Sequence, residues 1–195
     1  MDVLEFPDAA AWESWLAARH GERREAWLRI AKRHSGLALI TIGEALDVAL
    51  CFGWIDGRRR AHDAGSFLQR YSRRRPGSSW SKVNVEKVEA LTAAGRMRPT
   101  GLAEVAAAKA DGRWEGAYEP QRTAAVPPDL AAALAGDARA SAAFERLGRS
   151  DRYAVMLPLL KARSPEARAR ALARALARLA GSAPGDDAGE GRQPS

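Results

Sequence analysis

Residues 41–71 read TIGEALDVALCFGWIDGRRRAHDAGSFLQRY and encode a helix followed by two strands. Thr41 and Glu44 have capping-box spacing, in which the threonine hydroxyl accepts from the glutamate amide and the glutamate carboxylate accepts from the threonine amide. Gly53 follows the apolar run and suits the left-handed conformation that ends many helices. The pattern therefore predicts a helix over about 42–52.

Two strands are predicted after this helix. Residues 54–60 and 66–71 flank a turn at 62–65, which is typical of an antiparallel hairpin. Residues 25–32 form a third strand-like segment, and residues 3–6 are a shorter candidate. The sequence therefore predicts a small antiparallel sheet in the first part of the chain.

Helical patterns follow the hairpin. Start and stop signals predict one helix from about Ser81 or Asn84 to Ala94 and another over about 100–112. Residues 115–128 contain three prolines and no periodicity, so we expect a linker there. Beyond the linker the chain is alanine-rich, and helix signals recur up to Gly181.

The predicted fold class is α+β, a small antiparallel sheet packed by helices and followed by a helical C-terminal region. The expected domains are an α+β domain over 1–122, with its basic and aromatic hairpin, and a helical region over 123–181. Residues 182–195 lack large apolar side chains, so we expect a disordered tail.

Composition narrows the class of protein. The chain has 195 residues, 31 Lys and Arg against 24 Asp and Glu, and a single cysteine, Cys51. One cysteine excludes a disulfide framework and a cysteine-based zinc site, and the three histidines lack metal-ligand spacing, so we expect no metal and no cofactor. The longest uncharged run is the ten residues 34–43, which predicts neither a signal peptide nor a membrane span. The expected location is the cytoplasm.

Positive charge is concentrated in residues 58–82. The segment has eight positive side chains and one negative, Asp63, together with Phe67, Tyr71 and Trp80. Guanidinium groups bind phosphate or carboxylate, and aromatic rings stack on flat ligands, so the mixture suits an anionic small molecule, an acidic peptide or single-stranded nucleic acid. The competing interpretation is a solvated hairpin whose arginines keep the protein soluble.

No catalytic motif stands out. The sequence lacks a phosphate-binding loop, a dinucleotide-binding glycine motif and a nucleophile elbow. His62 and Asp63 in the hairpin turn are an acid–base pair by one interpretation and ordinary turn chemistry by the favoured one. Cys51 lies late in an apolar helix, which favours a buried, inert thiol.

Several short sequence motifs occur in an order that resembles the bacterial YdeI / OmpD-associated family, whose members are also called bacteriocin-protection proteins. They are FGWIDG at 52–57, LQRYSRRRP at 68–76 and WSKVN at 80–84, continued by residues 86–88, 95–97, 101–102, 108–114 and 126–127. The resemblance spans residues 12–180 and implies a role in stress tolerance or protection against bacteriocins, with no defined reaction. Relatives usually have proline at the position of Arg73, so the resemblance implies that Arg74 and Arg75 are the basic pair.

The first functional hypothesis is a cytoplasmic, non-enzymatic stress-protection protein that binds an anionic small molecule or acidic peptide. The arginines would hold the anion, the tryptophans would wall the pocket, and a helix N-terminus would supply amides. The candidate binding residues are Trp54, Asp56, Arg70, Arg74, Arg75, Trp80, Ser81 and Asn84.

Two alternatives stay open at this point. In the first, the protein is an enzyme of unknown reaction, with Asp56 as general acid or base in the same pocket. In the second, which is less favoured, the basic segment binds single-stranded nucleic acid. A structure that scattered Trp54, Asp56, Arg74 and Trp80 over separate faces would remove both pocket hypotheses.

Overall fold

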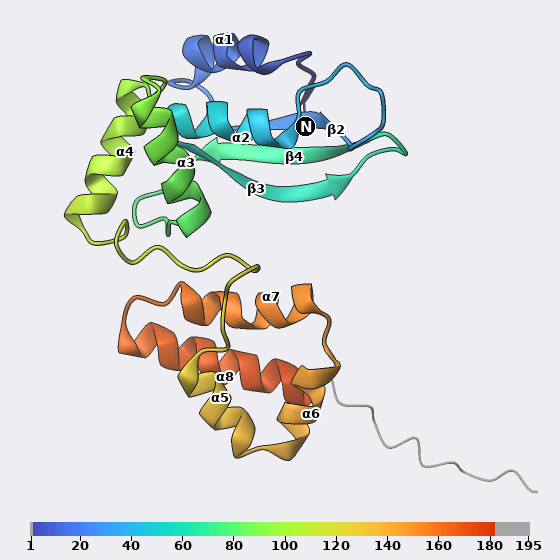
Figure 1. Ribbon diagram of the computed structural model, residues 1–195, viewed down its shortest axis with the longest axis vertical. Helices are drawn as coiled ribbons and strands as arrows, with labels where there is room; N and C mark the ends of the chain where they lie inside the picture. The colour runs from blue at the N-terminus through green and yellow to red at the C-terminus, as the bar shows by residue number, and fades with distance from the viewer. Residues whose placement is uncertain (1, 182–195) are drawn as a thin grey trace, which may run out of the picture. The chain divides into compact units, whose positions relative to one another are not determined.

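The chain divides into two compact units, Met1–Ala117 and Tyr118–Ser195. The computed structural model describes residues 2–181, so the expected disordered tail at 182–195 lies outside the described residues. The N-terminal unit combines a sheet with helices, and the C-terminal unit is helical where it is described (Figure 1). The predicted α+β class is confirmed.

The sheet of the N-terminal unit has the order β1-β2-β4-β3. Its strands are β1 (Val3–Leu4), β2 (Glu25–Ala31), β3 (Trp54–Ala61) and β4 (Ser66–Arg73). β3 and β4 form the antiparallel hairpin predicted from the sequence, β2 pairs antiparallel with β4, and β1 runs parallel to β2. The register of the hairpin shifts between Asp56 and Arg59.

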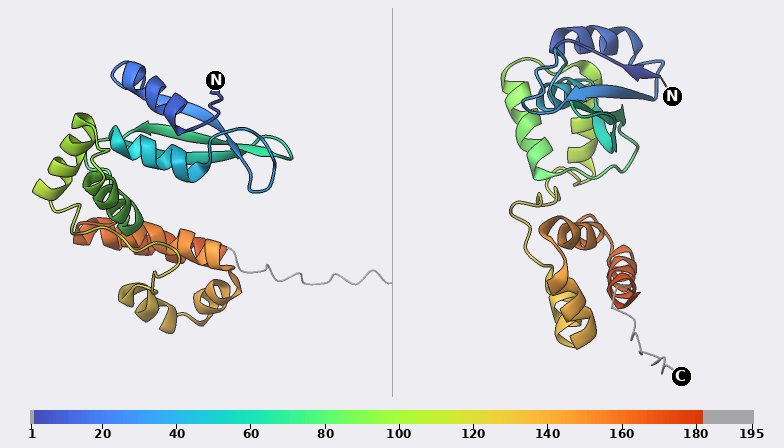
Figure 2. Two further views of the ribbon diagram at one scale, coloured as in Figure 1. Left: turned by 45° about the horizontal axis from the view of Figure 1, so that its top comes forward. Right: turned by 90° about the vertical axis from the view of Figure 1, so that its right-hand side faces the viewer.

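The helices of this unit are α1 (Ala9–Arg19), α2 (Ile42–Cys51), α3 (Lys82–Ala93) and α4 (Pro99–Ala110). α2 begins with the predicted capping box: the Glu44 amide donates to Thr41 Oγ1 at 3.3 Å, and the Thr41 amide donates to Glu44 Oε2 at 3.0 Å. Gly53, with φ of +75°, ends the helical segment as expected. Figures 1 and 2 show α3 and α4 at the end of the sheet where β3 begins.

The core of the N-terminal unit lies between one face of the sheet and the helices α1 and α2. Alternation on β2 directs Leu28 and Ile30 to this face, and both are fully buried. Trp12 of α1 donates its indole N–H to the Ala45 carbonyl of α2, and its ring lies 6.3 Å from that of Trp54, edge to face. Aromatic packing therefore joins both helices to the start of the hairpin.

The C-terminal unit has its own apolar core. Its helices are α5 (Pro128–Ala135), α6 (Ala138–Arg146), α7 (Arg149–Leu160) and α8 (Pro165–Gly181). Leu130, Leu159 and Leu179 are buried in this core. No helix within residues 2–181 combines the length and the apolar character that crossing a bilayer requires.

Candidate functional site

A pocket of about 320 Å³ lies where α2 turns into β3 and β4 ends. Its wall combines residues from the end of α1, the α2–β3 turn, the end of β4 and the start of α4. The lining residues are His20, Gly21, Phe52, Gly53, Trp54, Arg73, Arg74, Thr100, Ala103 and Glu104. The pocket therefore joins four segments that are far apart in sequence.

The turn at Gly53 shapes this pocket. Its backbone has φ of +75°, which glycine adopts without the steric cost that a side chain would add. A Cβ atom at Gly53 would lie 3.0 Å from Glu104 Cγ and 3.1 Å from the Thr100 carbonyl oxygen. The carbonyl of Gly53 accepts from the Arg74 amide at 3.2 Å. Glycine therefore lets α4 approach the hairpin closely and places Arg74 at the pocket.

Arg74 is buried, with 5% of its surface exposed. The central carbon of its guanidinium lies 3.5 Å from the ring centroid of Trp80, and its Nη1 donates to the Ser79 carbonyl at 3.2 Å. A cation over an indole ring in a desolvated site is a strong form of this interaction. Arg74 is therefore held in a fixed orientation between the pocket and Trp80.

The aromatic stack continues behind Arg74. The rings of Trp80 and Trp114 are 4.9 Å apart, and the indole N–H of Trp80 is buried with no hydrogen-bond partner within residues 2–181. Buried Arg113 donates from Nη1 to the Ser78 carbonyl at 3.0 Å. Two guanidinium groups therefore fix the loop that leads from β4 to α3.

The basic residues at the end of β4 differ in position. Arg73 is exposed, lines the pocket and donates from Nε to the Arg23 carbonyl at 3.0 Å. Arg75 is exposed and is not among the lining residues; its amide donates to Ser78 Oγ at 2.9 Å. The resemblance pointed to Arg74 and Arg75, whereas the pocket brings together Arg73 and Arg74.

Four other candidate residues belong to the pocket wall, to the segment behind Arg74 or to the start of α3. Trp54 lines the pocket but is 1% exposed, and Trp80, 2% exposed, lies behind Arg74. Ser81 caps α3 by accepting from the Asn84 amide at 3.2 Å, and Asn84 is buried in the first turn. Because the Asn84 amide already donates to the Ser81 hydroxyl, that amide is not available to bind an anion.

Asp56 and Arg70 lie outside the pocket. Asp56 is exposed on β3, in register with Tyr71. Arg70 neighbours Tyr71 on β4 and so faces the other side of the sheet, where its Nη2 lies 2.6 Å from Glu25 Oε2. The hydrogen bonds from Arg70 lower the pKa of Glu25. Of the predicted set, the structure brings Trp54 and Arg74 into one pocket with Trp80 behind them.

Sequence reasoning did not include His20, Thr100 and Glu104 in the site. They come from α1 and α4, and no local motif links them to the hairpin. One signal was available for Thr100, because Pro99 occupies the first turn of α4 and marks a helix start. The approach of that helix to Gly53 is a tertiary feature.

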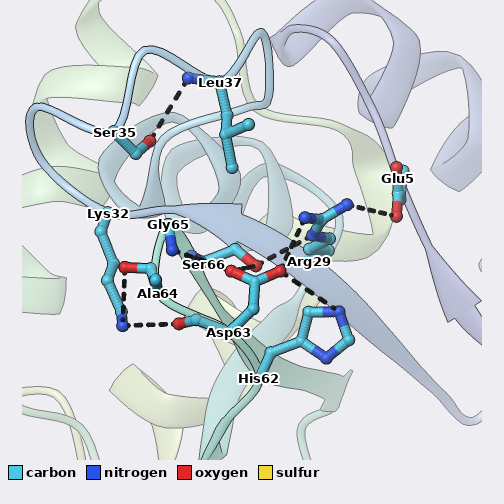
Figure 3. Close-up of polar contacts among 10 residues, drawn as sticks. All are labelled: Glu5, Arg29, Lys32, Ser35, Leu37, His62, Asp63, Ala64, Gly65 and Ser66. Atoms are coloured by element: carbon cyan, nitrogen blue, oxygen red, sulfur yellow. Dashed lines mark hydrogen bonds and ion pairs between the residues drawn. The ribbon is translucent and has the colours of Figure 1, made fainter.

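Asp63 organises the hairpin turn (Figure 3). Its Oδ1 accepts from the amides of Gly65 and Ser66 at 2.9 and 2.6 Å, and its Oδ2 accepts from Arg29 Nη2 at 2.8 Å. The hydrogen bonds from Ser66, Gly65 and Arg29 lower the pKa of Asp63 to about 2. A carboxylate so acidic is a weak base, which supports turn chemistry over an acid–base pair with His62.

Two further arginines of the hairpin, Arg59 and Arg60, pack on aromatic rings of the sheet. The guanidinium of Arg60 lies 4.8 Å from the Trp27 ring centroid, and that of Arg59 lies 4.3 Å from the Phe67 ring centroid. Their alkyl stems and planar heads cover aromatic surface. Much of the positive segment identified in the sequence therefore has a structural use.

Cys51 is buried, and burial raises the pKa of its thiol. The predicted buried thiol is confirmed, because desolvation disfavours the reactive thiolate. Within residues 2–181, no three side chains of His, Cys, Asp or Glu gather as metal ligands would.

Comparison with family models assigns both parts of the chain. A domain of unknown function (DUF8412) matches residues 4–104, which is more than half of the chain. The protein belongs to the family that this domain defines. Residues 123–181 match the model described as bacteriocin-protection, YdeI or OmpD-associated, which confirms the family resemblance. Searches of curated proteins and of solved structures found no match.

The two family matches cover different parts of the chain, and most of the short motifs quoted for the resemblance lie in the first of them. The motifs at 52–57, 68–76 and 80–84 lie inside the DUF8412 match. The YdeI or OmpD-associated match covers α5 to α8, where the resemblance rested on fewer motifs. The bacteriocin-protection name therefore attaches to the C-terminal unit, and the candidate pocket lies in the other family domain.

Proposed function

We propose that the protein binds a small anionic group in the pocket lined by Trp54, Arg73 and Arg74. The observation that carries the proposal is the presence of two consecutive arginines among the residues that line one pocket of about 320 Å³. Glu104 is the one acidic side chain among the described lining residues, so the pocket keeps a net positive charge. Phosphate, sulfate and carboxylate are the groups that guanidinium recognises best.

Pre-organisation supports this proposal. Arg74 is oriented by Trp80 and by the Ser79 carbonyl, and Arg73 by the Arg23 carbonyl. A side chain already fixed in its binding orientation loses little conformational entropy when a ligand arrives.

The geometry favours a small anion over single-stranded nucleic acid. Stacking of bases requires exposed ring faces beside a basic groove. Trp27, Trp54 and Trp80 are buried, and Arg60 covers the Trp27 ring. The enzyme hypothesis placed Asp56 inside the pocket, and Asp56 is not among the lining residues.

The physiological part of the proposal is a role in stress tolerance or bacteriocin protection in the cytoplasm. It is supported by the match of residues 123–181 to the bacteriocin-protection family. Expression of the chain in a sensitive bacterium should raise survival under bacteriocin challenge, and the protein should fractionate with the cytoplasm. Survival equal to that of the empty vector would remove this role.

Thermal unfolding in phosphate tests the binding proposal directly. A ligand that binds only the folded state stabilises it by about 2.7 kcal/mol at a hundredfold excess over Kd. All six tryptophans lie between residues 12 and 114, so tryptophan fluorescence follows the unit that contains this pocket. Phosphate should raise the melting temperature of the wild-type protein, and Arg73→Ala should remove most of that rise.

Two variants complete the test. Arg58→Ala removes an exposed arginine of the hairpin outside the pocket and should keep the full rise. Arg74→Lys keeps the charge but loses the planar fork, so its rise should be smaller than that of wild type. Equal losses in Arg73→Ala and Arg58→Ala, with a steep dependence on salt, would favour a diffuse polyanion surface and contradict the pocket.

A further inference from the structure

The C-terminal unit contains a second pocket, of about 420 Å³, which is independent of the site proposed above. It lies between the segment that precedes α5, the end of α6 and the start of α7. Three arginines line it, Arg122, Arg149 and Arg152, together with an apolar floor. The floor includes Phe144 and Met156, both buried.

Hydrogen bonds tie the walls of this pocket together. Tyr153 donates its hydroxyl to the Glu119 carbonyl at 3.0 Å, and Arg149 donates from Nη2 to the Arg122 carbonyl at 3.0 Å. A third bond runs from Gln121 Nε2 to Ser150 Oγ at 3.1 Å. The pocket is therefore built from a helix and from a segment before α5 that is fastened to it at three points.

Arg152 is oriented by the end of α6. Its Nε donates to the Leu147 carbonyl at 3.0 Å, its Nη2 donates to the Glu145 carbonyl, and its guanidinium lies 5.6 Å from the Phe144 ring centroid. These bonds use two of the five N–H groups of the guanidinium. The others have no hydrogen bond within residues 2–181, so they are available to a ligand.

The electrostatics of the pocket have one sign. None of the described side chains that line it is acidic. Arg122 is exposed, and its guanidinium has no hydrogen bond or ion pair in the described part of the chain. α7 begins after Gly148 without a side-chain cap, and Asp151 in its first turn is not among the lining residues.

We propose that this pocket binds an amphipathic organic anion, a carboxylate, sulfonate or phosphate attached to an aromatic or aliphatic body. The arginines would hold the charged group, and Phe144, Leu147 and Met156 would contact the apolar body. Pockets of a few hundred Å³ with an apolar floor and a few oriented polar groups are typical small-molecule sites. An inorganic ion alone would leave the apolar floor unused.

A matched pair of fluorescent probes tests both parts of the proposal. Anilinonaphthalene sulfonate carries the sulfonate on two aromatic ring systems, and N-phenylnaphthylamine has the same rings without the charge. The wild-type protein should bind the sulfonate at least about tenfold more tightly, which corresponds to about 1.4 kcal/mol. Similar Kd values for the two probes would contradict a charge-selective site.

Variants then locate the site. Arg122→Ala removes an exposed guanidinium, and Val126→Glu places a negative charge at a lining position that is 39% exposed, so neither change disturbs the core. Both should weaken sulfonate binding about tenfold and leave the neutral probe within about twofold. Arg170→Ala, at an exposed position of α8 outside the pocket, should have no effect.

Two outcomes would overturn the proposal. If Arg170→Ala weakens the sulfonate as much as Arg122→Ala, the probe senses overall charge and not this pocket. If Arg122→Ala and Val126→Glu leave sulfonate binding unchanged, the probe binds elsewhere. Arg73→Ala should not affect the sulfonate, so failure here is distinguishable from failure of the phosphate site in the other unit.

Discussion

The two units use arginine in opposite ways. In the N-terminal unit the positive residues are concentrated in one segment, 58–82, and several of them pack on aromatic rings or pair with a carboxylate. In the C-terminal unit the pocket arginines are separated by up to 30 residues in the chain, yet they surround one pocket of about 420 Å³. Of the arginines in the dense basic segment, Arg73 and Arg74 line the pocket of the N-terminal unit, so charge density in the sequence does not by itself locate a pocket.

The difference comes from secondary structure. Strand residues alternate between the two faces of a sheet, so the side chains of consecutive arginines within a strand point to opposite faces. Arg149 and Arg152 are one turn apart at the start of α7 and lie on the same side of the helix. Helical spacing therefore brings Arg149 and Arg152 to one pocket, whereas Arg58, Arg59 and Arg60 of the hairpin do not line the pocket at the end of β4.

The substitution Gly101→Ala should have the largest effect on stability, and it tests whether the two units unfold separately. A Cβ atom at Gly101 would lie 2.2 Å from the Cys51 carbonyl oxygen, so Gly101→Ala should destabilise the N-terminal unit by about 3 kcal/mol. In urea, tryptophan fluorescence should report the loss, while the helical circular dichroism of the C-terminal unit persists to higher urea. Coincident loss of both signals would contradict independent units.

Gly43→Ala is the matched control. Gly43 lies within α2, and its added Cβ would meet no atom within 4 Å. Alanine favours helix over glycine, so this change should stabilise the protein by up to about 1 kcal/mol. Destabilisation by both alanines would show that the effect at Gly101 is not the predicted clash.

Arg74 and Arg75 are consecutive residues, so their alanine variants compare the stability contribution of a buried arginine with that of an exposed one. Arg74→Ala removes the cation from Trp80 and the donor to the Ser79 carbonyl, so it should cost about 2 kcal/mol. Arg75→Ala, at the next residue and exposed, should cost less than about 0.5 kcal/mol. Urea midpoints that fall equally would mean that burial does not distinguish the two side chains.

Much of the fold could be predicted because its signals are local. The Thr41 capping box and Gly53 marked both ends of α2, and the turn around Asp63 marked the hairpin. The parallel pairing of β1 with β2 and the position of β2 beside β4 depend on contacts between distant segments. No periodicity in the sequence encodes those pairings.

The candidate site was harder to predict for the same reason. The sequence marked Trp54 and Arg74, but it could not show that Trp80 is buried or that Arg73, not Arg75, lines the pocket. Those outcomes depend on where β4 ends and on the loop that follows it. The pocket of the C-terminal unit escaped notice because Arg122 precedes Arg149 by 27 residues.

Substitutions at the N-caps of α2 and α7 should change the stability of the two units by smaller amounts. Thr41→Ala should destabilise the N-terminal unit by about 1 kcal/mol, because it removes the hydroxyl that accepts from the Glu44 amide. Thr41→Ser keeps the hydroxyl and should cost far less. Gly148→Ser adds the side-chain cap that α7 lacks and should stabilise the C-terminal unit by a few tenths of a kcal/mol. An unchanged urea midpoint for Thr41→Ala would mean that α2 does not depend on its cap.

The smallest effect concerns acid sensitivity of the hairpin. The folded-state pKa of Asp63 is about 2, and an unfolded aspartate titrates near about 3.9. Because the folded pKa is lowered, the stabilisation is complete above about pH 5 and is lost progressively as the pH falls toward about 2. Urea midpoints followed by tryptophan fluorescence should fall across this window, and Asp63→Asn should flatten the fall. The same fall in wild type and Asp63→Asn would assign it to other carboxyl groups.

Backbone NMR during a phosphate titration tests the central claim most directly, because it locates the anion residue by residue. We expect the amide shifts of Gly53, Arg73 and Thr100 to change together and to saturate with one Kd. The amides of residues 58–60 should stay unchanged, since those arginines lie outside the pocket. Amide shift changes that extend to residues 58–60 and do not saturate would contradict an anion-binding pocket at the end of the hairpin.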